Sequence, residues 1–423
     1  MPLLRAARRP PLIPAPYRPL LARGPFRRLL LPVVASDLGD GMSVVTVPWL
    51  ALQLAPPGWG GLYVGLAVAA YALPGALGAL VFGRWVRALP ARRLVVADAW
   101  LRTAMLGAIP ACWAVGVLRP ELYVALLTAS SVLHAWGSAG RYALVAQLLP
   151  PERRLPANAL VSASVSAATV LGPAVAGVLA TAIAPAWIIA VDAASFALLA
   201  VQAARLGGPV PPAEPEPVDQ APPGRAAEGL RVLRRRPELL GILALTWGFN
   251  FLYGPVEVAL PLHITTELHG DAGLLGAYWT AFGAGAVLGG LAAGLLRRLP
   301  LWGVTLAIVA GWGLLMVPFG LGAPAAVTVT CFGLGGLVYG PYTALTFTLF
   351  QNRTPSAQLT TVLAARSAAL LTSSPLGTAL GGPLTVAFAP HAVIAVSGLA
   401  TLGLAVAGAA FRPWARPSGL DGA

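Results

Sequence analysis

The sequence predicts an all-α membrane protein in which twelve transmembrane helices form two pseudo-symmetric six-helix halves. Three observations predict this fold. Of 423 residues, 57% are hydrophobic and 10% are charged, whereas a soluble domain carries about 25% charged residues. Apolar stretches of the roughly 20 residues that one bilayer crossing needs recur along the whole chain. The arginines fall mostly in the gaps between these stretches.

Each apolar stretch is expected to be a helix, because backbone polar groups in lipid need partners within their own segment. With the crossing length as the ruler, we place the spans at residues 29–54, 61–83, 94–117, 122–146, 157–182, 186–206, 239–264, 273–296, 302–322, 324–349, 361–385 and 390–411.

The distribution of arginine predicts the orientation of the chain. All 28 basic residues are arginine, and the net charge of +13 is, taken alone, also typical of nucleic-acid binding. An even-numbered topology places most arginine-bearing loops on one side of the bilayer, and the other side holds Arg119 alone. By the positive-inside rule both termini are cytoplasmic. We expect a multi-pass protein of the inner membrane whose partner is the lipid bilayer, not nucleic acid. The arginines on the cytoplasmic side include Arg27, Arg28, Arg84, Arg87, Arg92, Arg93, Arg153, Arg154, Arg225, Arg231, Arg234, Arg235, Arg236, Arg297, Arg298, Arg353, Arg412 and Arg416.

Composition divides the chain into five parts. Residues 1–25 are rich in Arg and Pro and lack the cleavage site of a signal peptide, so we expect a basic cytoplasmic tail. Residues 207–238 begin with a Pro-rich acidic segment that cannot pack a core. They end with a basic amphipathic helix, Ala226 to Pro237, against the inner leaflet. This linker separates the halves 26–206 and 239–412, and residues 413–423 form a second cytoplasmic tail.

The two halves repeat short motifs. Gly and Pro combine in Leu171 to Gly177 of the fifth span and again in Pro375 to Pro383 of the eleventh. Parallel repeats joined by one long cytoplasmic loop predict two halves related by an axis along the membrane normal. A cavity between such halves opens to either side by rocking.

A series of motifs follows one another in order: Ser36-Asp37-Leu38-Gly39-Asp40-Gly41-Met42, Asp98 with Arg102, Pro151-Glu152-Arg153, Asn158-Ala159-Leu160, Gly172-Pro173, Asp192-Ala193-Ala194-Ser195-Phe196 and Arg236-Pro237-Glu238-Leu239-Leu240. In this order and spacing, the chain from Phe26 to Phe411 resembles the major facilitator superfamily. Within it, the chain is similar to the bacterial branch with macrolide-efflux and enterobactin-exporter-like proteins. The resemblance implies a secondary active transporter that works by alternating access without a cofactor.

The chain departs from the family pattern at two places. The loop between the second and third spans usually carries an acid that latches the outward-facing state, but here Gly83-Arg84-Trp85-Val86 is followed by Arg87-Ala88. The basic cluster usual before the eleventh span is reduced to Gln358-Leu359-Thr360, which leaves Arg366 as a remnant. We therefore expect a latch that is weakened or rebuilt from other charges.

Asp37 and Asp40 are the first candidates for proton coupling, because an ionisable group at membrane depth is costly unless it is paired or hydrated. They lie about one helical turn apart on one face of the first span, with Asp40 near the bilayer centre. Two close carboxylates in a low dielectric resist simultaneous ionisation, which favours proton uptake. The alternative is pairing with an arginine of a neighbouring helix. We favour pairing for Asp37 and proton transfer for Asp40.

A charge network is expected around the third span. Asp98 and Arg102 are spaced i,i+4 with the acid first, the better order for an ion pair within a helix. We expect a structural pair that also reaches Asp37 or Arg141. Arg141 either replaces the missing loop acid in this network or extends to the headgroups. Arg366 is a further candidate member.

A polar stripe marks the seventh span, where Trp247, Asn250, Gly254 and Glu257 share one helical face. Such a stripe more often lines a cavity than faces lipid. Glu257 is then a second proton site or an attractor for a cationic substrate, or else it makes an interhelical hydrogen bond. With Trp247 and Asn250, the candidates for the cavity wall are the aromatic residues Trp136, Tyr278 and Tyr342.

The Gly172-Pro173 pair, with Gly177 further along the span, has a direct physical role. Small residues allow close helix approach, and proline bends a helix. By the resemblance, this motif marks exporters and seals one end of the cavity. It therefore favours efflux over uptake.

Three functions remain open at this point. The first is proton-driven efflux of an amphipathic small molecule such as a drug, siderophore or secondary metabolite. The second is uptake or uniport of a small solute on the same fold. The third, a membrane enzyme or non-transporting sensor, is disfavoured because Walker, Gly-x-Ser-x-Gly and His-Glu-x-x-His motifs are missing. Asp192 and the two cysteines, Cys112 and Cys331, are expected to be structural. We favour a monomeric exporter that uses protons and holds no metal.

Overall fold

The computed structural model describes residues 20, 24–81, 89–206, 231–293, 296, 299–354 and 356–410. Several expectations lie outside these ranges. They concern most of the basic tail 1–25, the loop with Arg84 and Arg87, residues 207–230 of the linker with Arg225, the pair Arg297 and Arg298, and the segment 411–423 with Arg412 and Arg416.

Ten helical segments of the described chain are long and apolar enough to cross a membrane. In the N-terminal half they are α2 (Pro25–Leu54), α5 (Ala91–Ala114), α6 (Pro120–Ser131) with α7 (His134–Leu148), α8 (Pro151–Ala180) and α9 (Pro185–Ala204). In the C-terminal half they are α11 (Pro237–Leu262) with the π-helix η1 (His263–Glu267), α12 (Ala272–Ala292), α13 (Leu301–Leu315) with α14 (Val317–Gly320), α15 (Ala325–Tyr339) with α16 (Tyr342–Arg353), and α19 (Pro390–Ala410).

Two further crossings complete the set. One is α3 (Gly60–Val81), and the other is α17 (Ser356–Leu370) followed by α18 (Ser373–Ala387). With the ten apolar segments they give twelve crossings, which confirms the predicted fold class.

Local chemistry sets where the helices begin. Proline is the first residue of α2, α6, α8, α9 and α11, where its missing N–H leaves no bond unmade and its fixed φ suits a helix. α12 begins differently, because the Asp271 carboxylate accepts a hydrogen bond from the backbone N–H of Leu274 at 3.0 Å.

Three crossings that we predict as continuous helices are interrupted near their centres. The breaks lie between α6 and α7, between α15 and α16, and between α17 and α18. Pro341 lacks the N–H that a continuous helix needs at the second break. At the other two, Ser131 and Thr372 donate side-chain hydrogen bonds to backbone carbonyls three residues earlier, at 3.2 and 2.8 Å. Such bonds compete with the helical pattern.

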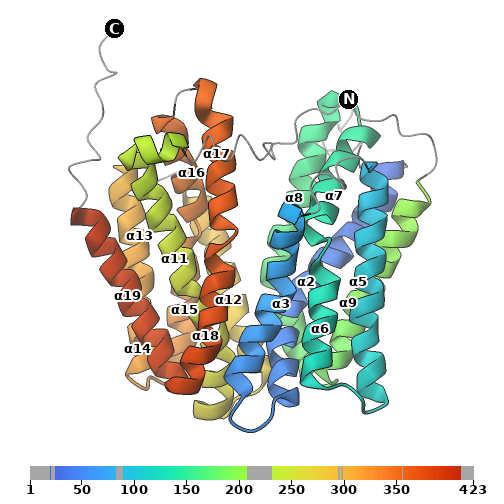
Figure 1. Ribbon diagram of the computed structural model, residues 1–423, viewed down its shortest axis with the longest axis horizontal. Coiled ribbons are helices and arrows are strands. Elements are labelled where there is room, and N and C mark those ends of the chain that lie inside the picture. The colour runs from blue at the N-terminus through green and yellow to red at the C-terminus, as the bar shows by residue number, and fades with distance from the viewer. Residues whose placement is uncertain are drawn as a thin grey trace, which may run out of the picture.

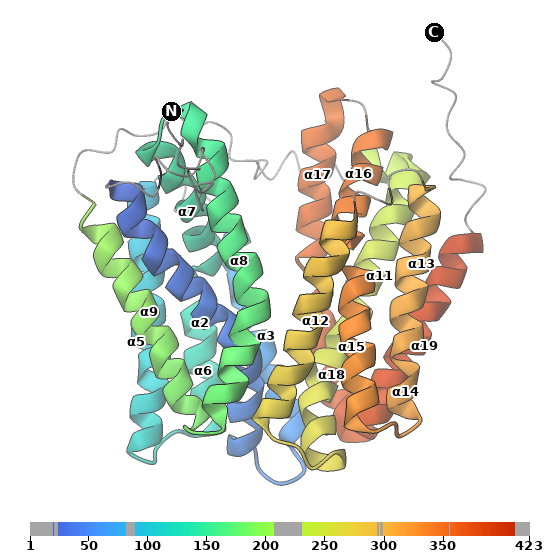
Figure 2. The ribbon, with the colours of Figure 1, turned by 180° about the vertical axis from the view of Figure 1, so that it is seen from behind.

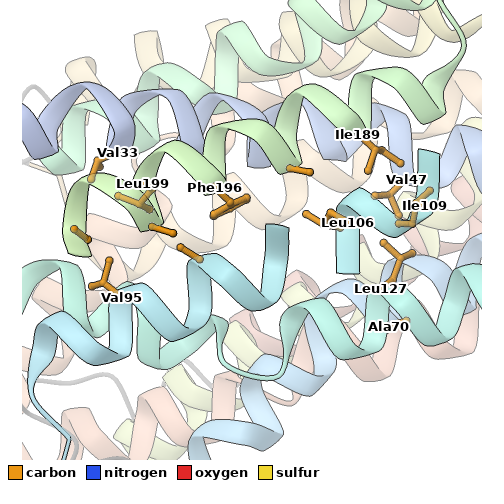
Figure 3. Packing of buried hydrophobic residues seen from close by; sticks show 14 of the residues in the cluster. Val33, Val47, Ala70, Val95, Leu106, Ile109, Leu127, Ile189, Phe196 and Leu199 are labelled. Carbon is orange, nitrogen blue, oxygen red and sulfur yellow. The ribbon is translucent and has the colours of Figure 1, made fainter. Parts of the chain in front are cut away.

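Each half has its own apolar core. In the N-terminal half, Phe196 and Leu199 of α9 pack among Val33 of α2, Val95 of α5 and their neighbours (Figure 3). In the C-terminal half, the core combines aliphatic side chains with several buried rings, among them Trp312. The two clusters also extend across the halves, since Val258 and Leu262 of α11 belong to the first and Met42 and Val45 of α2 to the second.

The two halves meet at one end only (Figures 1 and 2). We call the end at which α9 stops and α11 starts the linker end, and the opposite end the far end. Toward the far end α8 packs on α12, where a Cβ built on Gly177 would lie 3.1 Å from the Cα of Gly276. α3 packs on α18 in the same way, with 3.1 Å between a Cβ on Gly65 and the Cα of Gly382. These two glycine contacts form the seam between the halves.

Candidate functional site

A buried ion pair in the N-terminal half joins α2 to α5. The guanidinium of Arg102 donates to Oδ1 of Asp40 at 2.6 Å, and the hydroxyl of Tyr71 on α3 donates to the same oxygen at 2.6 Å. The Arg102 side chain is 1% exposed, whereas that of Asp40 is 23% exposed. The guanidinium also lies 4.7 Å from the ring centroid of Phe196 on α9, which is within cation–π range. Arg102 is thus held from three helices while Asp40 stays reachable.

A second carboxylate lies beside the same arginine. Nε of Arg102 is 3.8 Å from Oδ1 of Asp98, one turn earlier on α5. The Asp98 carboxylate fits against α7 only because residue 137 is a glycine, since a Cβ there would overlap it. Arg102 therefore lies between Asp40 and Asp98, and its shorter contact is with Asp40.

Asp37 makes a different set of contacts. Its Oδ1 accepts from Arg141 of α7 at 2.6 Å, and its Oδ2 accepts from the hydroxyl of Ser164 on α8 at 2.5 Å. The Asp37 and Arg141 side chains are 4% and 9% exposed. Asp37 thereby ties three helices together in a closed set of partners.

Asp192 of α9 is a buried carboxylate without an ion pair among the described residues. It is 1% exposed, and its Oδ2 accepts from Ser43 of α2 at 3.2 Å. Its Oδ1 has no hydrogen-bond partner among the described residues, and it forms no ion pair there. Gly39 makes room for it, since a Cβ at that position would overlap the carboxylate.

A cavity of about 320 Å³ exposes part of these residues, which we call the charge cluster (Asp37, Asp40, Asp98, Arg102, Arg141 and Asp192). Its lining includes Asp37, Asp40, Tyr71, His134 and Arg141 from α2, α3 and α7. The cluster has four aspartates and two arginines, so acidic groups outnumber cationic ones. The two acids on the cavity wall, Asp37 and Asp40, are each paired with one of the arginines, so the surplus lies in Asp98 and Asp192 behind the wall.

The C-terminal half presents one carboxylate among aromatic rings. Glu257 of α11 accepts from the hydroxyl of Thr378 on α18 at 3.2 Å, and no described cation forms an ion pair with it. It is close enough to Tyr253 and Tyr339 to interact electrostatically with both. We call the partly exposed rings Tyr253, Trp279, Phe282 and Tyr339, which contact one another, the aromatic wall.

Trp247 and Asn250, which we predict to line the substrate cavity, both lie on the polar stripe of α11. The indole N–H of Trp247 donates to the hydroxyl of Thr372 at 3.1 Å, and its ring stacks on Phe251 with centroids 5.1 Å apart. Asn250 donates to the carbonyl of Thr246 in its own helix at 2.7 Å. Both side chains are partly exposed.

Tyr278, Tyr342 and Trp136, which we also predict to line the substrate cavity, are buried. This corrects their expected placement. Tyr278 is 0% exposed and shares a hydrogen bond of 2.5 Å with Thr328, while Tyr342 and Trp136 are 2% and 6% exposed. The sequence indicates that these rings lie in helices, but aromatic residues also fill cores, so it does not indicate which face they occupy.

Arg366 is not brought together with the N-terminal charges, contrary to our expectation of one network. It lies in α17 of the C-terminal half and is 5% exposed. Its guanidinium lies 4.1 Å from the ring centroid of Phe347 and donates to Thr346 at 3.3 Å. A planar guanidinium can be held in this way by stacking.

The Gly-Pro motif of α8 lies at the seam. Gly172 packs on α2, where a Cβ built on Gly41 would lie 3.2 Å from the Cα of Gly172. One turn further along α8, Gly276 of α12 packs on this helix. A Cβ built on Gly276 would lie 2.7 Å from the carbonyl oxygen of Pro173 and 2.8 Å from the Cα of Gly177. The motif therefore contacts its own half on one side and the opposite half on the other.

Comparison with known proteins decides the family. The sequence profile described as Major Facilitator Superfamily matches residues 29–370. The chain belongs to the major facilitator superfamily. This confirms the family that the motifs indicated.

This major facilitator protein is similar to named exporters. Multidrug efflux pump Tap of Mycobacterium tuberculosis is 29% identical over 378 residues, which cover 86% of this chain and 88% of Tap. Enterobactin exporter EntS of Citrobacter koseri is 28% identical over 262 residues, covering 62% of this chain and 61% of EntS.

Solved major facilitator structures share the fold. A bacterial homologue of the lysosomal transporter Spinster, in an inward-facing and unoccupied conformation, superposes with a TM-score of 0.69 at 15% identity, covering 94% of this chain and 96% of that one. The nucleoside transporter NupG gives 0.60 at 15% identity, covering 91% and 98%. The major facilitator protein described here is thus a multi-pass inner-membrane transporter of small molecules and not an enzyme.

Several partners in the charge cluster of this major facilitator protein were not predicted. Ser164 is 127 residues from Asp37, and Ser43 is 149 residues from Asp192. A buried serine in an apolar helix carries no sequence signal that names its partner. The contact of the Tyr71 hydroxyl with Asp40 likewise depends on the folded arrangement.

Proposed function

We propose that this protein exports an amphipathic small molecule in exchange for protons, with both termini in the cytoplasm. The observation that carries the proposal is the position of Asp40. It is the most exposed carboxylate of the three that form ion pairs in the N-terminal half, and it lines the cavity. A proton can therefore reach it without unfolding the bundle.

Proton binding at Asp40 changes what Arg102 contacts. A neutral Asp40 no longer attracts the guanidinium, whereas Asp98 is 3.8 Å from Nε of the same arginine. Arg102 then moves toward Asp98, which releases α2 from α5 at this level. Loss of the proton restores the Asp40 contact. A ligand shifts a conformational equilibrium only by its differential affinity for the two states. Here the ligand is the proton, and the exchange of partners by Arg102 gives Asp40 a different proton affinity in each state.

The Gly-Pro motif and the relatives support export. Gly172, Pro173 and Gly177 lie at the seam toward the far end, where a sealed contact is needed while the other end is open. With the arginine-rich side in the cytoplasm, the end at which the halves do not meet faces the cytoplasm. Tap and EntS are named as an efflux pump and an exporter, and we extend that direction to this chain.

The aromatic wall and Glu257 support an amphipathic substrate. Flat rings provide apolar contact area, and an unpaired carboxylate among them favours a cationic group. The acidic surplus of the charge cluster acts in the same direction. We therefore expect an apolar molecule that carries positive charge at one end.

The proposal is tested by transport into inverted membrane vesicles, with ethidium as the probe. In such vesicles, export appears as accumulation driven by an acidic interior. We expect accumulation with the wild-type protein, and accumulation at the level of protein-free vesicles with Asp40→Asn. Accumulation that persists after the gradient is collapsed, and that Asp40→Asn leaves intact, would overturn the proposal.

A matched control is Glu121→Gln. Glu121 is a carboxylate at the start of α6 that accepts an exposed hydrogen bond from Tyr63 at 2.7 Å, outside the cavity. This variant removes one negative charge, as Asp40→Asn does, and is expected to transport like the wild type. An equal loss of ethidium accumulation in both variants would show that net charge, and not the position of Asp40, determines transport.

A further inference from the structure

An apolar groove of about 330 Å³ opens at the linker end of the C-terminal half. Its walls come from α11, α13, α16 and α19, and include Leu240, Gly241, Trp302, Leu404 and Gly408. Along α11 it runs from Pro237 to Leu245, a distance of about 12 Å at the rise of a helix. The groove is distinct from the charge cluster, which lies in the other half.

The groove exists because α19 separates from α11 toward the linker end, where its ribbon leans outward (Figures 1 and 2). Nearer the far end the two helices are tied, since the hydroxyl of Ser397 donates to the carbonyl of Leu252 at 2.5 Å. By contrast, a Cβ built on Gly241 would meet no atom within 4 Å, and Leu240 beside it is 39% exposed.

The mouth of the groove carries an ion pair with one further arginine beside it. Nη1 of Arg353, at the end of α16, lies 2.8 Å from Oε2 of Glu238, in the first turn of α11, and these are the two charged residues of the lining. Arg236 donates to the carbonyl of Arg353 at 3.1 Å. One and two residues before Arg236, the side chains of Arg235 and Arg234 are exposed.

A buried anchor holds this basic segment at the groove. Leu233 is 0% exposed and packs with Leu239, Ile242, Leu349 and other residues in a core cluster at the linker end. Arg234 and Arg235 therefore emerge from a short helical segment that is fixed to the bundle.

We propose that this groove binds the acyl chain of an anionic phospholipid, whose phosphate lies at Arg236 and Arg353. The walls are apolar and open toward the outside of the bundle, which suits a lipid chain. Arginines at the mouth outnumber Glu238, so an anionic headgroup is favoured over a zwitterionic one. Basic pockets between transmembrane helices commonly bind such headgroups. A bound phosphate competes with Glu238 for Arg353, and thereby acts on the link between α11 and α16.

Trp302 provides a local readout, because it lines the groove. The purified full-length protein is reconstituted with phosphatidylglycerol or phosphatidylcholine whose acyl chain is brominated near the headgroup. Subtracting the fluorescence of Trp302→Phe isolates the signal of this indole. We expect bromine to quench it at a several-fold lower fraction of phosphatidylglycerol than of phosphatidylcholine. Equal quenching by the two lipids, or no quenching by either, overturns the proposal.

Two matched pairs of variants separate the groove from general effects. Gly241→Leu fills open space in the groove and is expected to abolish the quenching, while Gly403→Leu, which also meets open space but lies outside the lining, leaves it unchanged. Replacing Arg236 with Gln is expected to remove the preference for phosphatidylglycerol. The control is Arg154→Gln, at an arginine of the other half that likewise donates to a backbone carbonyl, that of Leu149 at 3.3 Å. If a control variant reduces the quenching or the lipid preference as much as the variant it is matched with, the assignment is refuted. These readouts measure binding, so they do not depend on the direction of transport.

Discussion

Replacing Asp37 with alanine is predicted to destabilise the protein severely, although Asp40, one turn away, tolerates neutralisation. Asp37 is 4% exposed and pairs with Arg141 at 2.6 Å and Ser164 at 2.5 Å. Asp37→Ala leaves the guanidinium of Arg141 buried without its ion-pair partner. Breaking a buried pair in this way costs about 3–5 kcal/mol.

The magnitude translates into a thermal shift. For domains of about 150–250 residues, 1 kcal/mol corresponds to roughly 2–4 °C in Tm, so Asp37→Ala is expected to lower Tm by about 6–20 °C. The double variant Asp37→Leu with Arg141→Met removes both charges and keeps apolar volume. It is expected to recover most of the loss, because replacing a whole buried pair with apolar residues is often neutral or better.

The assay is a thermal melt of the purified full-length protein in detergent, followed by tryptophan fluorescence. Asp40→Asn is the comparison, because its side chain is 23% exposed; we expect it to lower Tm by less than about 4 °C, or roughly 1–2 kcal/mol. A shift below about 2 °C for Asp37→Ala, or a double variant less stable than both single variants, would refute the reasoning. Normal yield of an Asp37→Asn variant combined with lost proton coupling would exchange the roles assigned to the two acids.

Three further predictions concern the seam and the unpaired acids. Gly276→Ala puts a methyl group 2.7 Å from a carbonyl of α8, so it is expected to cost about 1–3 kcal/mol at the seam and to raise hydrogen–deuterium exchange in α8 and α12, unlike Gly403→Ala. Asp192→Asn keeps an acceptor for Ser43 and loses no cationic partner, so Tm is expected to stay within about 3 °C (1 kcal/mol) of the wild type; a larger fall would indicate a charged partner. Glu257→Gln is expected to weaken ethidium binding about tenfold, or 1.4 kcal/mol, in an equilibrium binding titration, and an unchanged affinity would exclude it as the cation site.

The twelve crossings were predictable because each is a stretch of chain whose length matches a bilayer. What the sequence did not indicate is where crossings break. A break at Ser131 or Thr372 depends on side-chain hydrogen bonds to the backbone, and the same residues also occur inside continuous helices. Pro341 is no better guide: proline disfavours a continuous helix, yet Pro48, Pro110 and Pro255 lie inside helices that continue through them.

The charge cluster was predictable in its members and only partly in its pairing. The spacing of Asp98 and Arg102 indicates an ion pair within α5, but the arginine lies 3.8 Å from that acid and 2.6 Å from Asp40, which is 62 residues away in the sequence. Local spacing describes which groups can meet on one helix, whereas helix packing selects among distant carboxylates. Tyr278 shows the same limit, because its burial depends on the orientation of α12 against α15.

The glycine seam has a kinetic consequence. Where two helices contact through Gly177 and Gly276 or through Gly65 and Gly382, neither surface has knobs that must withdraw from holes before the surfaces part. At these four positions no side chain has to change rotamer, whereas beside them Thr385 lies against Gly61 and Val170 against Gly283. The glycine contacts themselves therefore add little friction to the separation of the halves, and the resistance there comes from the side chains packed beside them.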